Sequence, residues 1–127
     1  MMAGNVVALR LAERIRQDAE PIAAIYRDLG TASAEHVVSR ALGELALAMA
    51  GLADRVQAHD LADLDRQLRR LQGMAGPLGM VSLGEVAGDV RACLARADVH
   101  AFAEVWARLL RVAERSLAID PALEQRL

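Results

Sequence analysis

The sequence LADLDRQLRRLQGMAGPLGM, residues 61–80, decides the fold class of this chain. Its apolar residues recur at alternating steps of three and four positions, which is the spacing of one face of an α-helix. This stripe consists of Leu61, Leu64, Leu68, Leu71, Ala75 and Leu78. Gly73, Gly76, Pro77 and Gly79 loosen the end of the pattern, because glycine and proline disfavour a helix interior. The stretch predicts an amphipathic helix whose leucines enter a core.

Three more helices are predicted before this stretch. Residues 5–19 form the first, and Pro21 marks a fresh start for a second helix that stops at Gly30. A third helix, capped by Thr31 or Ser33, runs to about residue 58. The inner face of the third helix is Val38, Leu42, Leu45, Met49, Leu52 and Val56. The short loops between these helices imply that neighbouring helices are antiparallel.

Two helices are predicted after the stretch. Ser82 and Glu85 match a capping box at the start of the fifth helix. Asp98 is expected to cap the sixth helix, which Pro121 ends. The expected inner faces are Leu83, Val86, Val90, Leu94 and Ala97 on the fifth helix, and Phe102, Val105, Trp106, Leu109, Val112, Ala113 and Leu117 on the sixth. Trp106 is therefore expected in the core.

The composition supports helix along the whole chain. Hydrophobic residues make up 54% of it and aromatic residues only 2%. Ala and Leu are the most frequent types, and both lose little side-chain freedom in a helix. We predict an all-α protein with an antiparallel four-helix bundle over residues 31–120 and an additional N-terminal helical hairpin over residues 1–30. Residues 121–127 are a C-terminal tail.

Charge, apolar runs and cysteine content exclude several classes of protein. The formal net charge of -2 gives no basic field for nucleic acid. The longest apolar run, residues 45–53, is too short to cross a bilayer, and early charged residues argue against a signal peptide. Cys93 is the only cysteine, which excludes an internal disulfide, and it is expected to be a small buried hydrophobe. We expect a cytoplasmic protein that binds neither membrane nor nucleic acid.

The solvent side of the helix in residues 61–80 carries a long cation among small side chains. At 100° per residue, Arg69 points roughly 130° away from the centre of the Leu stripe. Its neighbours on that side are Ala62, Arg66, Gly73 and Gly76. Small neighbours lower the local surface and let another protein approach, so the pattern predicts a docking surface. In the alternative interpretation, the glycines face a neighbouring helix or a kink before Pro77.

The same stretch resembles the signature of the histidine phosphotransfer family. That family carries a helix reading His-x-Leu-Lys-Gly, followed by small residues, an apolar residue and Gly. The matching positions here are Leu71, Gly73, Ala75, Gly76, Leu78 and Gly79. Residues 58–64 resemble the turn before that helix, and the resemblance extends over residues 35–119. It implies a four-helix bundle that works with receiver domains and sensor histidine kinases of two-component phosphorelays.

Two departures fall on the functional positions of that family. Arg69 stands where the family has its phosphorylated His, and Gln72 stands where it has a Lys. A neutral imidazole has a lone pair and a pKa near 6.5, whereas a guanidinium stays protonated and has no free lone pair. Arg69 is therefore not expected to carry a phosphoryl group. The chain resembles a degenerate member that is not an enzyme.

Other chemistry is sparse. None of the three histidines is followed by the Gly of the motif or has a partner base at useful spacing, and they show no metal-ligand spacing. They are His36, His59 and His100. A small acidic cluster at the start of the motif helix has an ordinary explanation, because carboxylates favour helix N-termini. It consists of Asp60, Asp63 and Asp65. We expect no metal and no cofactor.

Three functions remain open at this point. The first is a binding module that docks with a receiver domain or sensor kinase through Ala62, Arg66, Arg69, Gln72, Gly73 and Gly76. The second is an active phosphorelay protein that uses another His. The third is a structural bundle, with a homodimer interface formed by the N-terminal hairpin.

Overall fold

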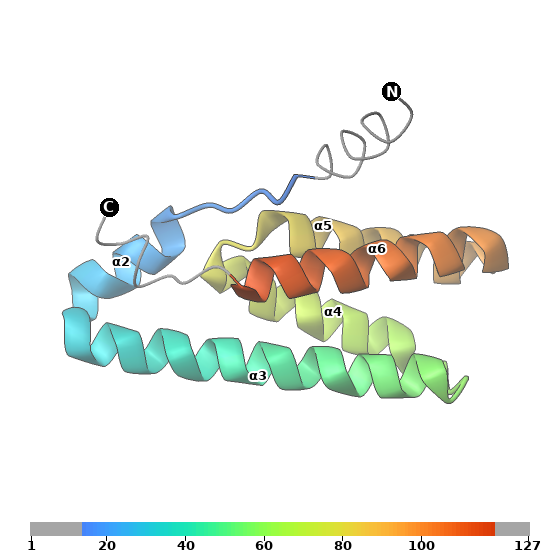
Figure 1. The fold of residues 1–127 in the computed structure, drawn as a ribbon, viewed down its shortest axis with the longest axis horizontal. Helices are drawn as coiled ribbons and strands as arrows, with labels where there is room; N and C mark the ends of the chain where they lie inside the picture. Colours follow the sequence, from blue (N-terminus) through green and yellow to red (C-terminus); the bar gives the residue numbers. More distant parts are fainter. Residues whose placement is uncertain (1–13, 119–127) are drawn as a thin grey trace, which may run out of the picture.

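The computed structural model describes residues 14–118, and within this range the chain is helical and contains no strand. Figure 1 shows the order of the elements along the chain. They are α2 (Glu20–Leu29), α3 (Thr31–Gln57), α4 (Leu64–Ala75), the short 3-10 helix η1 (Gly76–Leu78), α5 (Val81–Arg96) and α6 (Val99–Ala118). The all-α prediction is confirmed for these residues.

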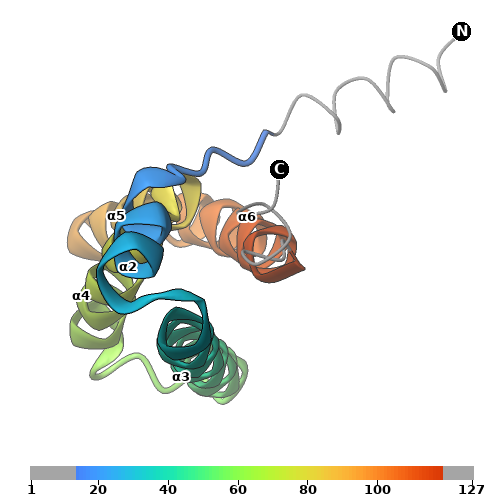
Figure 2. The same cartoon turned by 90° about the vertical axis from the view of Figure 1, so that its left-hand side faces the viewer.

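The helix α4 lies at the centre of the arrangement. It packs against α3 on one side and α5 on the other, and α5 packs against α6. The end view in Figure 2 shows α3, α4, α5 and α6 following one another around a curve, with α2 lying across one end. The helices α3 and α6 contact each other far less than consecutive helices do. The two ends of this helix series are therefore joined mainly through α4 and α5.

The core is formed by the stripes that the sequence predicts. Leu64, Leu68, Leu71, Ala75 and Leu78 of the central stretch are buried. Only Leu61 departs from the prediction: α4 begins at Leu64, so Leu61 lies in the preceding turn and is 45% exposed. The fully or nearly fully buried large side chains of the other helices include Leu45, Leu83, Val86, Val90, Leu109 and Val112. The motif helix thus supplies the middle of the core.

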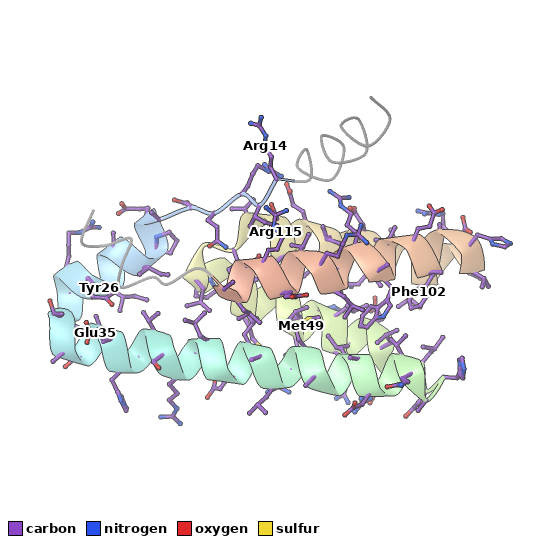
Figure 3. The ribbon with its side chains drawn as sticks, viewed as in Figure 1. Arg14, Tyr26, Glu35, Met49, Phe102 and Arg115 are labelled. Atoms are coloured by element: carbon purple, nitrogen blue, oxygen red, sulfur yellow. The ribbon has the colours of Figure 1, made fainter. Side chains whose placement is uncertain are left out.

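The side of the core between α3 and α6 is less fully covered. Met49 of α3 is buried, whereas Phe102 of α6 is half-buried (Figure 3). The ring of Phe102 stacks on that of Trp106, with centroids 6.3 Å apart, and Trp106 is buried as expected. Cys93 is also buried, as expected. Ala97 was expected to face inward, but it is exposed because it ends α5 with a positive φ of 53°.

The prediction of a helix over residues 5–19 is wrong for the residues that the structure describes. Residues 14–18 are not helical, and residues 5–13 lie outside the described range. Residues 14–18 instead form an extended segment, which we call the strap. Its backbone amides donate hydrogen bonds from Asp18 to the Gly79 carbonyl (2.7 Å) and from Arg16 to the Ser82 hydroxyl (2.6 Å). Backbone hydrogen bonds therefore hold the strap against the segment that follows the motif helix.

The second helix of the predicted hairpin exists as α2. Its Ile22 is part of the core, and Ile25 and Tyr26 pack against that core. The helix contacts α3 and η1 of its own chain. The apolar face of α2 is therefore turned toward its own chain at Ile22, Ile25 and Tyr26, whereas Leu29 at its end is 49% exposed.

Two of the three predicted helix caps are wrong. Ser82 lies inside α5, which begins at Val81, and its hydroxyl accepts from Arg16 instead of capping the helix. Glu85 forms an ion pair with Arg16 rather than reaching back to Ser82. The helix α3 begins directly after Gly30 and has no side-chain cap, so neither Thr31 nor Ser33 caps it. The third prediction is confirmed, because the Asp98 carboxylate accepts from the backbone amide of Ala101 at 3.0 Å.

The length and composition of α3 are sufficient for a helix that crosses a bilayer, and 22% of its most apolar window is buried. A core helix of a soluble protein meets the same test, so this observation does not assign α3 to a membrane. Its buried residues Val38, Leu45, Met49 and Leu52 belong to the common core.

Candidate docking site on α4

Most of the predicted docking residues are exposed on α4 or in the turns at its two ends. Arg66 and Arg69 are exposed, with side chains 72% and 66% accessible to solvent. Gly73 and Gly76 are also exposed. Ala62 is exposed but lies in the turn before the helix. The structure therefore brings five of the six predicted residues onto α4 or its immediate C-terminal end, with Gln72 among them.

The two glycines open onto solvent. A Cβ atom added to Gly73 or Gly76 would meet no surrounding atom of the described residues within 4 Å. This finding argues against the interpretation in which the glycines make room for a neighbouring helix. The other half of that interpretation is confirmed in part, because α4 ends at Ala75 and the chain tightens into η1 through Gly76 and Pro77. The face beside Arg69 is therefore low and accessible.

The arginines of this face are held by two carboxylates at the start of α4, one at its N-cap position and one in its first turn. Arg66 binds Asp63 at 2.6 Å, and Arg69 binds Asp65 at 3.2 Å. Both pairs are exposed, so each contributes little to stability. They do fix where the guanidinium groups rest when no partner is bound.

Asp65 is shared between two arginines. Its Oδ2 accepts from Arg69, and its Oδ1 accepts from the Arg91 Nε at 2.9 Å. The hydrogen bond from Arg91 is the main cause that lowers the pKa of Asp65 below its ordinary value, and the charge of Arg69 adds to the effect. Asp65 therefore stays ionised and links α4 to α5.

Gln72 is a structural link rather than an outward-facing contact. Its Nε2 donates to the Gly84 carbonyl at 3.0 Å, and its Oε1 accepts from Arg91 Nη1 at 2.9 Å. The contact is close, since a Cβ added to Gly88 would lie 3.0 Å from Gln72 Nε2. Gln72, at the position where the resembled family has a Lys, thus links α4 to α5 through hydrogen bonds.

Arg91 is the site residue that the sequence analysis missed. It belongs to α5, its side chain is 29% exposed, and it contacts both Asp65 and Gln72. Its partners lie 26 and 19 positions earlier in the chain. Only the packing of α5 on α4 brings these three side chains together, so no local sequence pattern predicts their contact.

The remaining chemistry-bearing residues are scattered. All three histidines are exposed, and they lie in the first turns of α3, in the turn before α4 and at the start of α6. They are His36, His59 and His100, in that order. Within residues 14–118, no three His, Cys, Asp or Glu side chains gather as a metal site. Asp63 and Asp65 of the acidic cluster instead bind arginines.

No protein-family model, curated protein or solved structure matches this chain.

Proposed function

We propose that this protein is a non-catalytic signalling module of the histidine phosphotransfer type. In this proposal α3, α4, α5 and α6 correspond to the four-helix bundle of that family, and the strap and α2 are additions at its N-terminal side. The module docks through the outer face of α4 with a receiver domain or sensor kinase of a cytoplasmic phosphorelay.

One observation carries the proposal: an exposed arginine lies one turn before an open glycine, Gly73, on a helix whose other face is fully buried. A glycine inside a helix costs up to about 1 kcal/mol of helix stability relative to alanine. No neighbouring helix explains that cost at Gly73, whereas Gly76 follows the last residue of α4 and begins η1. A partner whose backbone approaches the low surface beside Arg69 does explain it.

The chemistry of Arg69 supports docking rather than phosphoryl transfer. Receiver domains surround their phosphorylatable Asp with further carboxylates, and a guanidinium forms forked hydrogen bonds with such groups. Arg69 pairs with Asp65 through a single exposed contact. A partner carboxylate replaces that contact at little cost, because solvent screens an exposed ion pair and it contributes little to stability. The complex then excludes a competent phosphotransfer protein from the same receiver.

The experiment is calorimetric titration of the protein against the receiver domains encoded in its source genome. We expect at least one to bind and Arg69→Asp to weaken that binding by about tenfold or more, because the substitution reverses the charge that enters the acidic pocket.

Arg27→Asp is the matched control for this experiment. Arg27 lies on α2, its side chain is 60% exposed, and it also pairs with a carboxylate of its own helix, Glu20. Equal affinity of wild-type protein and the Arg69 variant would refute the role of Arg69, and the absence of any binding receiver would refute the proposed function.

A further inference from the structure

A second surface lies between α3 and α4, beside the docking face. The two helices enclose a hollow of about 380 Å³. Its lining includes Leu47, Gly51, Leu52, Arg55 and Arg70, together with Glu44, whose carboxylate pairs with Arg40 at 3.5 Å. Leu47 stands at this hollow with 74% of its surface exposed, whereas Leu52 is buried beneath it. The hollow therefore combines an apolar floor, one projecting leucine, two cations and one carboxylate that is already paired with Arg40.

The two cations of the hollow differ from those of the docking face. Arg66 is held by Asp63, the N-cap residue of α4, and Arg69 is held by Asp65 of α4. Neither Arg55 nor Arg70 makes an ion pair with a carboxylate of residues 14–118. Arg55 has a local role, because a cation in the last turn of α3 complements the helix dipole. Arg70 lies in the middle of α4 and has no such role.

The hollow is continuous with the docking face. Arg66 and Arg70 are four residues apart on α4, so their side chains are neighbours along the helix. A partner that covers Arg66 and Arg69 reaches the hollow by extending over α4 toward α3. The hollow and the docking face are thus two parts of one surface, with α4 between them.

We infer that this hollow is the second half of the docking surface and that it receives an acidic segment of the partner carrying an apolar side chain. The inference rests on the proposed function. The partner's carboxylates meet Arg55 and Arg70, and its apolar side chain packs on Leu47. These arginines have no internal ion pair within residues 14–118, so a partner's carboxylates do not have to break one on binding.

A protein segment fits this surface better than a lipid headgroup layer does. Membrane-bound helices present a continuous apolar face. Here a single exposed leucine stands at a hollow flanked by charge, and the whole chain is acidic, with a net charge of -2. The hollow is therefore complementary to an acidic protein segment rather than to a lipid headgroup layer.

The test uses the receiver domain that binds the wild-type chain. The double variant R55Q/R70Q should weaken binding by about tenfold, and Leu47→Ala by about threefold, because each removes a contact while leaving the core intact. Arg96→Gln is the matched control, since Arg96 lies on α5 and α4 separates that helix from α3 (Figure 2). It should change the affinity by less than about twofold.

A second measurement separates this inference from the proposed function. Addition of the receiver to the ¹⁵N-labelled protein should shift the amide signals of Gly51 and Arg70 together with that of Gly73. Shifts confined to the side of Gly73, with unchanged affinity of R55Q/R70Q, would overturn the inference and leave the proposed function standing. Binding of anionic phosphatidylserine vesicles that R55Q/R70Q abolishes would overturn it in favour of a lipid surface. Failure of every receiver to bind would overturn both.

Discussion

At the residue scale, Asp65 sets the charge of the docking face. Its carboxylate holds Arg69 with one oxygen and Arg91 with the other. Two guanidinium groups that share one carboxylate leave an excess positive charge at the surface. Arg69 is also the more weakly held of the two, at 3.2 Å against 2.9 Å. A partner's carboxylate therefore competes for Arg69 while Arg91 keeps Asp65 in place.

The pKa of Asp65 depends on its contacts with Arg91 and Arg69. Because Arg91 is the main cause of the lowered pKa, Arg91→Gln should raise it toward the ordinary carboxyl value of about 3.9. Because the pKa of Asp65 is lower in the folded protein than in the unfolded chain, ionised Asp65 stabilises the fold at any pH above the unfolded pKa. This contribution disappears as the pH falls through the folded pKa. Carboxyl ¹³C titration by NMR measures the shift. Arg66→Gln serves as the control and should leave Asp65 unchanged; equal pKa values in the two variants would contradict the assignment to Arg91.

At the scale of elements, the strap explains why Gly79 follows the motif helix. Gly79 has a φ of +70°, and a Cβ added to it would lie 1.8 Å from the carbonyl oxygen of Asp18. The obstacle is backbone, so an alanine cannot be accommodated without moving the strap. We expect Gly79→Ala to lower the free energy of unfolding by about 1–3 kcal/mol.

Gly73→Ala provides the opposite case for this prediction. A Cβ there meets no surrounding atom of residues 14–118 within 4 Å, and alanine favours helix over glycine by up to about 1 kcal/mol. Urea denaturation should therefore show a gain in stability for Gly73→Ala and a loss for Gly79→Ala. A gain in stability for Gly79→Ala would show that the strap does not constrain Gly79.

The strap also shows where sequence reasoning ends. The stripes of α3, α4, α5 and α6 could be predicted because burial of one helix face imposes its spacing on the sequence. Residues 14–19 have apolar residues at the same spacing, Ile15 and Ala19, yet they are not helical. Their backbone partners are Gly79 and Ser82, more than 60 residues away. No local pattern contains that information, and the same holds for the contact between Gln72 and Arg91 that completes the candidate site.

At the scale of the whole molecule, α4 serves both the core and the docking face. It joins α3 to α5, and α5 in turn holds α6. Leu68 lies in the middle of α4 and is fully buried. Its loss should therefore weaken the packing on both sides of the helix. The neighbouring surface of α3 carries an exposed leucine instead, since Leu47 is 74% exposed.

The two leucines give a matched pair of variants that separate folding from docking. Leu68→Ala should lower the free energy of unfolding by about 2–5 kcal/mol, since it removes buried methyl groups and leaves a cavity. Leu47→Ala should change it by less than about 0.5 kcal/mol, because solvent already surrounds most of that side chain. Urea denaturation followed by circular dichroism measures both. A large loss of stability in Leu47→Ala would mean that this leucine belongs to the core of the molecule, and weakened receiver binding by that variant would then have to be attributed to unfolding.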